Sequence, residues 1–348
     1  MPTFTADKLH TIAFRILSAA GLHDADADIV AGELKKANLA GHDSHGVIRL
    51  MQYVDYIEQG FAQPTAQVEV ITDRPAFAVI DGHFAFGQIA AQRAVQLGLE
   101  KAGAQGTATI VIRNCNHVGR LGSYSQQAAQ AGFATMMAVD APGPGGVAPF
   151  GGMDRRLGTN PISMAVPWGK DQLVLDMTSS ATAEGKLRVA FQKGESVPEG
   201  WIINATGQPT IDPAEFYADP PGAILPLGGP LGFKGFGLSV MIDMFAGILS
   251  GSGVCRTDLP RGSNGVWMYF LDISQFVPRE QFDALVVKYV DWIKSSRTMP
   301  GVEAILMPGE IEKNRQMQRE AEGIVVAEET WRQLSELATR IGADLSDV

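Results

Sequence analysis

The chain has 348 residues, of which 45% are hydrophobic and 19% are charged, and its formal net charge is −10. This composition is ordinary for a globular protein, and the length fits one large domain or two to three closely packed ones. The negative charge argues against nucleic acid or an anionic membrane as a partner. An anionic ligand would therefore need a local cluster of cationic groups.

The cysteines and the N-terminal segment indicate the compartment. Cys115 and Cys255 are the two cysteines of the chain, and neither belongs to a CxxC motif. A disulfide framework or a thiolate zinc site is therefore not expected. The N-terminal segment lacks the apolar run of a secretory signal, and no stretch of about 18 apolar residues predicts a membrane span. We expect a cytoplasmic protein.

Apolar periodicity and turn residues predict the elements in chain order. Two helices are expected over residues 5–39, and a third over 46–58 with Asp43 or Ser44 as its N-cap. The remaining predictions are a strand at 77–81, a helix at 87–103, a strand at 107–112, a helix at 122–131 capped by Ser123, strands at 133–140, 160–167 and 173–178, a helix at 181–190, a hairpin within 201–211, a helix at 234–250, a strand at 265–274, and helices at 279–295 and 328–341. No repeat or linker is visible, so any domains are expected to be interwoven.

One stretch matches the dinucleotide-binding fingerprint in its letters but not in its structural context. Residues 143–148 match G-x-G-x-x-A after a predicted strand. The fingerprint must open a helix, but Pro149 and two glycines follow immediately. A turn-rich loop is the better interpretation, so no Rossmann site is predicted here.

The segment HDSHGVIRL, residues 42–50, concentrates polar chemistry. In a helix that begins near Ser44, the side chains of His45, Arg49 and Tyr53 would lie on one stripe. An imidazole can move a proton near neutral pH, and a guanidinium can hold a carboxylate by two parallel hydrogen bonds. This set suits a 2-hydroxy or 2-keto acid, with its carboxylate on Arg49 and its carbon-2 oxygen near an imidazole.

Two other interpretations of this segment stay open. The acidic and hydroxyl side chains could merely cap the helix, while Arg49 pairs with a surface acid such as Asp55. Alternatively, His42, Asp43 and His45 could bind a metal ion together with His117, as in a metal-dependent hydrolase or lyase. A binding protein without catalysis is a third class.

Two more stretches carry candidate functional residues. Residues 114–125 contain His117 between a predicted strand and a predicted helix, where α/β proteins commonly bind ligands. The glycine-rich stretch 228–237 places Lys234 at the start of a long apolar helix. Free N–H groups at a helix N-terminus, together with a lysine, favour a phosphate group.

Six stretches resemble the malate/L-lactate dehydrogenase family, whose members are unrelated to the Rossmann enzymes of similar name. They are AGHDSHGVIRL (40–50), NHVGRLGSYSQQAAQAGF (116–133), APFGGMDRRLGTNPISMAVP (148–167), LVLDMTSSATAEGKLRVA (173–190), GFKGFGLSVMIDMFAGILSG (232–251) and ILMPGEIEKNRQMQREAEGI (305–324). Within the family the chain most resembles the hydroxycarboxylate dehydrogenase B branch.

The resemblance implies an α/β (α+β) fold, in which a non-Rossmann mixed β-sheet domain for NAD or NADP packs on a helical domain built from both chain ends. It implies residues 1–115 with 291–348 for the helical, substrate and dimerisation part, and 116–290 for the cofactor domain. A homodimer is expected. The implied activity is reversible hydride transfer between carbon 2 of a small 2-hydroxy acid and NAD(P). Reduction of a cyclic imino acid with NADPH is the alternative within the family.

The resemblance also implies residue roles. Ser44, His45 and Arg49 match the family motif S-H-G-x-x-R, with His45 as acid/base and Arg49 on the substrate carboxylate. His117 matches a second family histidine, so the choice between the two for proton transfer stays open. The implied catalytic residues are Ser44, His45 and His117; the implied substrate-binding residues are Arg49 and Tyr53; the implied cofactor-binding residues are Asp176, Met177, Thr178, Ser179, Lys234, Gly235, Pro308, Gly309 and Glu310.

The chain departs from the family pattern at two places near the implied cofactor residues. Phe233 stands where the family usually has histidine, and the loop reads DMTSS in place of DMATS. The choice between NAD and NADP stays open for this reason.

Overall fold

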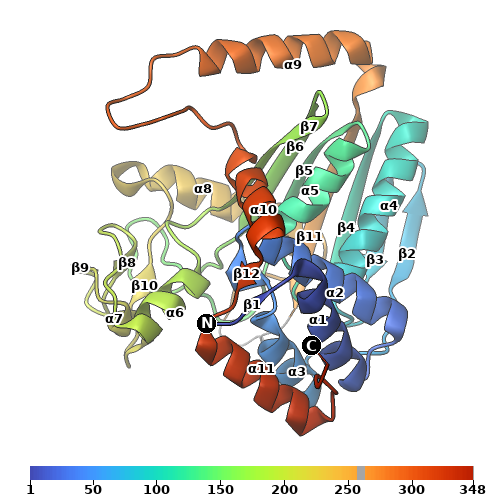
Figure 1. The fold of residues 1–348 in the computed structure, drawn as a ribbon. Coiled ribbons are helices and arrows are strands. Elements are labelled where there is room, and N and C mark those ends of the chain that lie inside the picture. Colours follow the sequence, from blue (N-terminus) through green and yellow to red (C-terminus); the bar gives the residue numbers. More distant parts are fainter. Residues whose placement is uncertain (257–262, 348) are drawn as a thin grey trace.

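A seven-stranded sheet forms the centre of the computed structural model, which describes residues 1–256 and 263–347 (Figure 1). In sheet order the strands are β2 (Glu69–Arg74), β3 (Phe77–Asp81), β4 (Thr107–Cys115), β11 (Asn264–Asp272), β5 (Phe133–Asp140), β6 (Pro161–Trp168) and β7 (Asp171–Thr178). Among the described pairs of this sheet, β3 and β4 run parallel and the others run antiparallel. The fold is therefore mixed α/β, and the sheet is not the parallel sheet of a Rossmann domain.

Both faces of the sheet are covered, and the alternation of side chains along β5 shows how. Met137 and Val139 belong to the core under α4 (Gly87–Gln105) and α5 (Leu121–Gln130). Ala138 instead contacts the core under α8 (Phe233–Ile242), which continues as a π-helical segment over Asp243–Ile248. Successive side chains of a strand point to opposite faces, so helices must cover each side.

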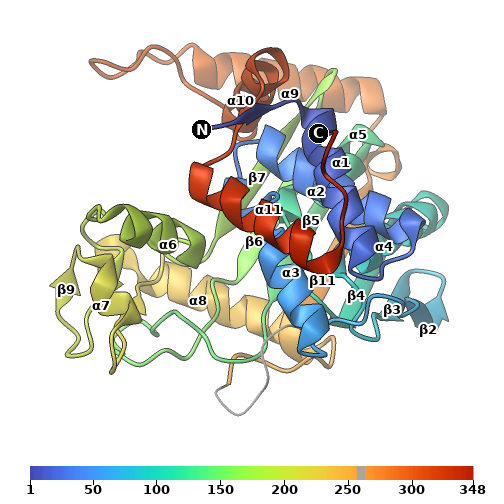
Figure 2. The same cartoon turned by 60° about the horizontal axis from the view of Figure 1, so that its bottom comes forward.

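A helical cluster gathers both chain ends. It contains α1 (Ala6–Ala19), α2 (Asp24–Leu39), α3 (Arg49–Glu58), α11 (Glu328–Ile341) and a two-stranded pairing of β1 (Thr3–Phe4) with β12 (Ile324–Val325). Leu9, Leu34, Leu50 and Leu334 are fully buried in its shared core. Figure 2 shows α11 beside α1 and α3, consistent with their contacts.

A third, smaller unit has its own core. It holds α6 (Glu184–Lys193), α7 (Pro213–Tyr217) and the short strands β10 (Ala223–Ile224), β8 (Ile202–Ile203) and β9 (Pro209–Thr210), in that sheet order. Leu187, Phe216 and Ile224 are buried together within it. The predicted hairpin is confirmed by the pairing of β8 with β9. The predicted helix at 181–190 begins later, at Glu184.

Two further helices, α9 (Arg279–Lys294) and α10 (Glu310–Glu322), lie outside these three groups. In Figure 1, α9 lies across the top, and a long connection leads from it to α10. Val290 is the buried residue of α9, and α10 has none. The segment that forms α10 lacks apolar periodicity, which is why the sequence did not predict this helix.

Most predicted elements are confirmed within a few residues, and three details are wrong. The edge strand β2 was missed, because its side chains are largely exposed and polar. Ser123 does not cap α5; Arg120 stands at the N-cap, and the Ser123 hydroxyl donates to the Glu33 carboxylate. The third predicted helix begins at Arg49 and not at residue 46, as described below.

The sheet extends across the predicted domain boundary. Strands β2, β3 and β4 lie before residue 116, and β4 hydrogen-bonds to β11 in the same sheet as β5. The division of the chain at residues 115 and 116 stays a prediction, with strands of one sheet on either side of it. No helix of the described residues has the length and apolar character needed to cross a membrane.

Candidate active site

The HDSH segment forms a single 3-10 turn, η1 (Asp43–His45), before α3 begins at Arg49. The predicted cap is wrong, because Ile48 stands at the N-cap of α3 without a side-chain bond. The Asp43 carboxylate instead pairs with Arg319 of α10, at 2.6 Å, and accepts from the Asn38 amide, at 2.7 Å. His45 therefore lies outside the helix, and a four-residue helical spacing does not relate it to Arg49.

Gly46 lets this turn sit against a buried asparagine. The Val47 N–H donates to Asn38 Oδ1 over 2.9 Å, and Asn38 is 4% exposed. A Cβ atom at Gly46 would lie 2.2 Å from the same oxygen. Glycine is therefore required here by the close approach of a side chain.

The turn directs its four polar residues in two directions. His42 Nε2 lies 3.4 Å from Glu312 Oε1, so His42 faces α10, as Asp43 does. Ser44 Oγ lies 3.1 Å from His45 Nδ1. A Cβ atom at Gly185 would lie 2.9 Å from that of Ser44, which places the start of α6 directly against the turn.

His45 and His117 meet across this site, although they are far apart in the sequence. Their ring centroids are 5.4 Å apart, and the ring planes are inclined by 24°. The Tyr53 hydroxyl lies 2.9 Å from His117 Nδ1, and Tyr53 is fully buried. The structure thus brings together three residues that the sequence predicted for the site.

Both imidazoles are neutral at physiological pH. Burial lowers the pKa of His45 to about 3, and the charges of Arg49, His42 and Arg120 add to this effect. Burial, followed by the charges of Arg49 and His45, holds the pKa of His117 well below its ordinary value. A neutral imidazole can accept a proton, which is what the oxidation of an alcohol requires of a base.

Arg49 is positioned by the turn and keeps donors for a ligand. Its Nε donates to Ser44 O, and its Nη1 donates to Gln52 Oε1, each over 2.6 Å. Its Nη2 has no hydrogen-bond partner among the described residues. The alternative pairing with Asp55 is wrong, because the Asp55 carboxylate lies near Arg340. The Arg49 guanidinium could therefore bind an anion that lies beside the two imidazoles.

The predicted cofactor residues converge on β7 from three segments. Asp176, Met177 and Thr178 end the strand, and Ser179 follows it. A Cβ atom at Gly235 would lie 2.3 Å from Leu227 O and 2.9 Å from Ser179 O, so α8 begins in close contact with this segment. Pro308 O accepts from Val174 N over 3.0 Å, which attaches the loop just before α10 (the late loop, residues 295–309) to the same strand.

Individual members of this group differ in the freedom of their side chains. The Asp176 carboxylate accepts from Gly122 N, at 2.9 Å, and lies 3.5 Å from Arg120 Nε. The Glu310 carboxylate accepts from Met307 N and pairs with Lys294, which also lowers its pKa. Lys234 is exposed at the second residue of α8. The two carboxylates therefore hold the structure together, whereas the lysine is available to a ligand.

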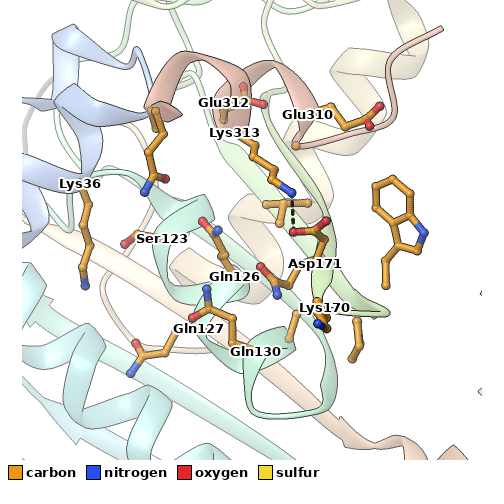
Figure 3. Close-up of a pocket in the computed structure, with 18 of the residues that line it drawn as sticks. Lys36, Ser123, Gln126, Gln127, Gln130, Lys170, Asp171, Glu310, Glu312 and Lys313 are labelled. Atoms are coloured by element: carbon orange, nitrogen blue, oxygen red, sulfur yellow. Dashed lines mark hydrogen bonds and ion pairs between the residues drawn. The ribbon is translucent and has the colours of Figure 1, made fainter. Parts of the chain in front are cut away.

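A cleft of about 940 Å³ lies between α5, α10 and the turn that joins β6 to β7. Gly309 and Glu310 line it, but His45, His117 and Arg49 do not. Figure 3 shows the Lys313–Asp171 ion pair, of 2.6 Å, at this cleft. The cleft therefore adjoins the late loop and not the imidazole pair.

The described residues provide no ligand set for the metal site considered above. No three His, Cys, Asp or Glu side chains of the described residues are grouped as they would be around an ion. Asp43 and His42 instead pair with Arg319 and Glu312 of α10. The four residues of that hypothesis do not converge.

Comparisons with known proteins identify the family of the chain. A family model described as malate/L-lactate dehydrogenase matches residues 4–335, and the malate dehydrogenase of Pyrococcus horikoshii is 38% identical over 97% of this chain and 95% of that protein. The chain belongs to the malate/L-lactate dehydrogenase family. Hydroxycarboxylate dehydrogenase B of Escherichia coli is 35% identical over 97% of this chain and 94% of its own. A solved structure of malate dehydrogenase from Pyrococcus horikoshii has a TM-score of 0.88 and 34% identity, covering 99% of this chain and 96% of the other.

Family membership confirms the resemblance and the class of reaction. The protein is an oxidoreductase that uses a nicotinamide cofactor and acts on 2-hydroxy acids. The alternative class, a metal-dependent hydrolase or lyase, is wrong. Relatives with different substrate names stand at similar identity, 38% and 35%, so membership alone does not choose the substrate.

The structure adds two residues to the candidate site that the sequence did not predict. Gln88, fully buried at the start of α4, donates to the Tyr53 hydroxyl over 2.7 Å. Arg120 is 6% exposed and lowers the pKa of His45. Arg120 stood within a stretch that matched the family, so it could have been found. Nothing in the sequence distinguished Gln88 from the other glutamines of its helix.

Proposed function

We propose that this dehydrogenase reversibly oxidises a small 2-hydroxy carboxylic acid, such as malate or lactate, at carbon 2. The observation that carries the proposal is the stacked pair of imidazoles, 5.4 Å apart, beside the Arg49 guanidinium, with burial lowering the pKa of both rings. A carboxylate bound to Arg49 would place the adjacent carbon and its oxygen near the imidazoles. Positioning of this kind supplies much of the rate in hydride transfer.

Each residue of the site has a distinct proposed role. Arg49 binds the substrate carboxylate through Nη1 and Nη2, and Tyr53 lines the same wall. An imidazole takes the hydroxyl proton during oxidation and returns it to the carbon-2 oxygen during reduction. Ser44 orients His45 through the 3.1 Å contact with Nδ1. The bound carboxylate also offsets the Arg49 charge, which removes one cause of the low His45 pKa.

The residues around β7 fit a dinucleotide. The N-terminus of α8, with the exposed Lys234, offers backbone N–H groups and a positive charge to a pyrophosphate. Gly235 allows the helix start to approach Ser179 closely. We assign the cofactor to Asp176–Ser179, Lys234–Gly235 and Pro308–Glu310. When bound, NAD or NADP supplies the acceptor or donor of the hydride.

We also propose that the protein is a homodimer. Helix α9 exposes Leu285, Tyr289 and Trp292 at 54, 61 and 76%, and exposed apolar patches often mark interaction surfaces. Replacing Trp292 with glutamate should shift the molecular mass measured by light scattering from dimer to monomer. Ile71→Glu, on the edge strand β2, is the control and should remain dimeric. A monomeric parent protein would contradict the proposal.

A substrate panel tests the reaction. Malate, lactate, glycerate, hydroxyphenylpyruvate and a cyclic imino acid should be assayed with each cofactor by nicotinamide absorbance. Turnover of 2-hydroxy or 2-keto acids is expected, with an ester of the same acid inactive. Turnover of the imino acid alone would establish the reductase alternative. Absence of turnover with every acid would refute the proposed substrate class.

A further inference from the structure

A series of hydrogen bonds between buried polar side chains ends at the ring of His117. Gln88 Nε2 donates to the Tyr53 hydroxyl over 2.7 Å, and that hydroxyl lies 2.9 Å from His117 Nδ1. Gln88 and Tyr53 are each 0% exposed, so water does not compete for these contacts. A Cβ atom at Gly87 would lie 2.1 Å from Asn116 O, which means that glycine allows α4 to begin against the loop that carries His117.

The protons of this hydrogen-bond series can be assigned one by one. Burial raises the pKa of Tyr53 to about 12, so its phenol keeps its one proton. The phenol oxygen accepts from Gln88, and its proton is therefore directed to His117 Nδ1. A neutral imidazole that accepts at Nδ1 carries its own proton at Nε2. His117 Nε2 has no hydrogen-bond partner among the described residues.

We propose that Gln88 is a positioning residue that sets the tautomer of His117, so that Nε2–H is a fixed hydrogen-bond donor toward the substrate. This inference rests on the proposed function of the site. A group fixed as a donor by its neighbours orients the carbon-2 oxygen or the carboxylate. His45, whose Nδ1 contacts only the rotatable Ser44 hydroxyl, then remains the imidazole that changes its protonation.

The unpaired atom of Gln88 supports a functional role. Its Oε1 is buried without a hydrogen-bond partner among the residues that the structure describes. A buried atom without a partner lowers folding stability by about 1–3 kcal/mol relative to a paired one. Such atoms in native proteins call for an explanation, and a functional role is one. In the opposite amide orientation, Oε1 would accept from Tyr53, and Tyr53 would accept from His117 Nδ1–H. The amide orientation thus decides whether His117 presents a donor or an acceptor.

The tautomer can be read directly in the free, full-length protein. Nitrogen NMR of protein labelled with ¹⁵N-histidine distinguishes protonated from bare ring nitrogens, and loss of a signal in His117→Asn assigns it. The parent protein should carry its proton at Nε2. Gln88→Glu should move it to Nδ1, because a carboxylate accepts the Tyr53 proton and cannot donate. A parent protein with the proton at Nδ1 would overturn the inference.

Kinetics of matched variants test whether the tautomer matters. Gln88→Met should lower kcat for 2-keto acid reduction several-fold, because only the molecules with His117 protonated at Nε2 then donate to the substrate, with little change in KM for the cofactor. Gln92→Met, one turn along α4, removes a glutamine that donates to Glu33 and should leave kcat unchanged. In a Tyr53→Phe background Gln88→Met should have no further effect, because the two act through one chain. Equal losses in both backgrounds would overturn the inference.

The two proposals can fail separately. The NMR experiment needs no substrate, so the tautomer can be established even if the panel of acids is not turned over. Conversely, turnover of the acids with His117 protonated at Nδ1 would keep the proposed function and refute the role of Gln88. If Gln88→Glu does not fold, NMR of the parent protein and of Gln88→Met still tests the inference. Gln88→Met should show signals of both His117 tautomers, whereas the parent should show one.

Discussion

Replacing Arg49 with alanine should lower kcat/KM for a 2-keto acid by about 10²- to 10³-fold. The reason is the loss of a guanidinium whose Nη2 and second Nη1 proton are available to the carboxylate. Removing one partner of a buried, hydrogen-bonded charge pair costs about 2–5 kcal/mol, and each 1.4 kcal/mol is about tenfold in rate. Steady-state kinetics with pyruvate or oxaloacetate would measure the loss.

Two controls separate the carboxylate role from a general disturbance of the site. Arg49→Lys keeps the charge but loses the planar pair of donors, so an intermediate loss is expected. Arg340→Ala, which removes an exposed arginine of α11, should behave as the parent. The decisive comparison is a ketone without a carboxylate. If Arg49→Ala reduced turnover of that ketone as much as that of the keto acid, Arg49 would not be the carboxylate ligand.

Replacing His45 with asparagine should lower kcat by about 10²- to 10⁴-fold, the usual contribution of a positioned acid or base. His117→Asn should instead raise KM for the substrate and lower kcat less, because His117 acts as a fixed donor. Both variants fill a similar volume, so they form a matched pair. A larger loss of kcat in His117→Asn than in His45→Asn would reverse this assignment.

The pH dependence of alcohol oxidation gives an independent check on His45. Oxidation requires the unprotonated imidazole, and the pKa of His45 is lowered to about 3, so this form dominates at any higher pH. We therefore expect kcat/KM for oxidation to show no histidine inflection near pH ~6.5, where an ordinary imidazole titrates. An inflection there in the parent protein that is lost in His45→Asn would show that His45 is not held neutral.

The chemistry of the site was predictable from residue types, but its geometry was not. His45, Arg49 and Tyr53 were expected on one helical stripe, and the structure places all three in the candidate site. Their convergence has another cause, since η1 places His45 outside α3. Asn38 accepts from Val47 N, and Asp43 pairs with Arg319, so long-range partners replaced the local cap.

The sequence by itself determined the strands and helices with clear apolar periodicity, the family, and the residue types that carry the chemistry. Periodicity reports which face of an element is buried, and a motif reports which groups must be present. Only the tertiary structure decided that His117 meets His45, that Gly235 lies against Ser179, and that Gln88 reaches Tyr53. These contacts join residues distant in the chain, and their existence depends on how the buried faces pack. A single glutamine among several on one helix carries no local signal of the hydrogen bond it will make.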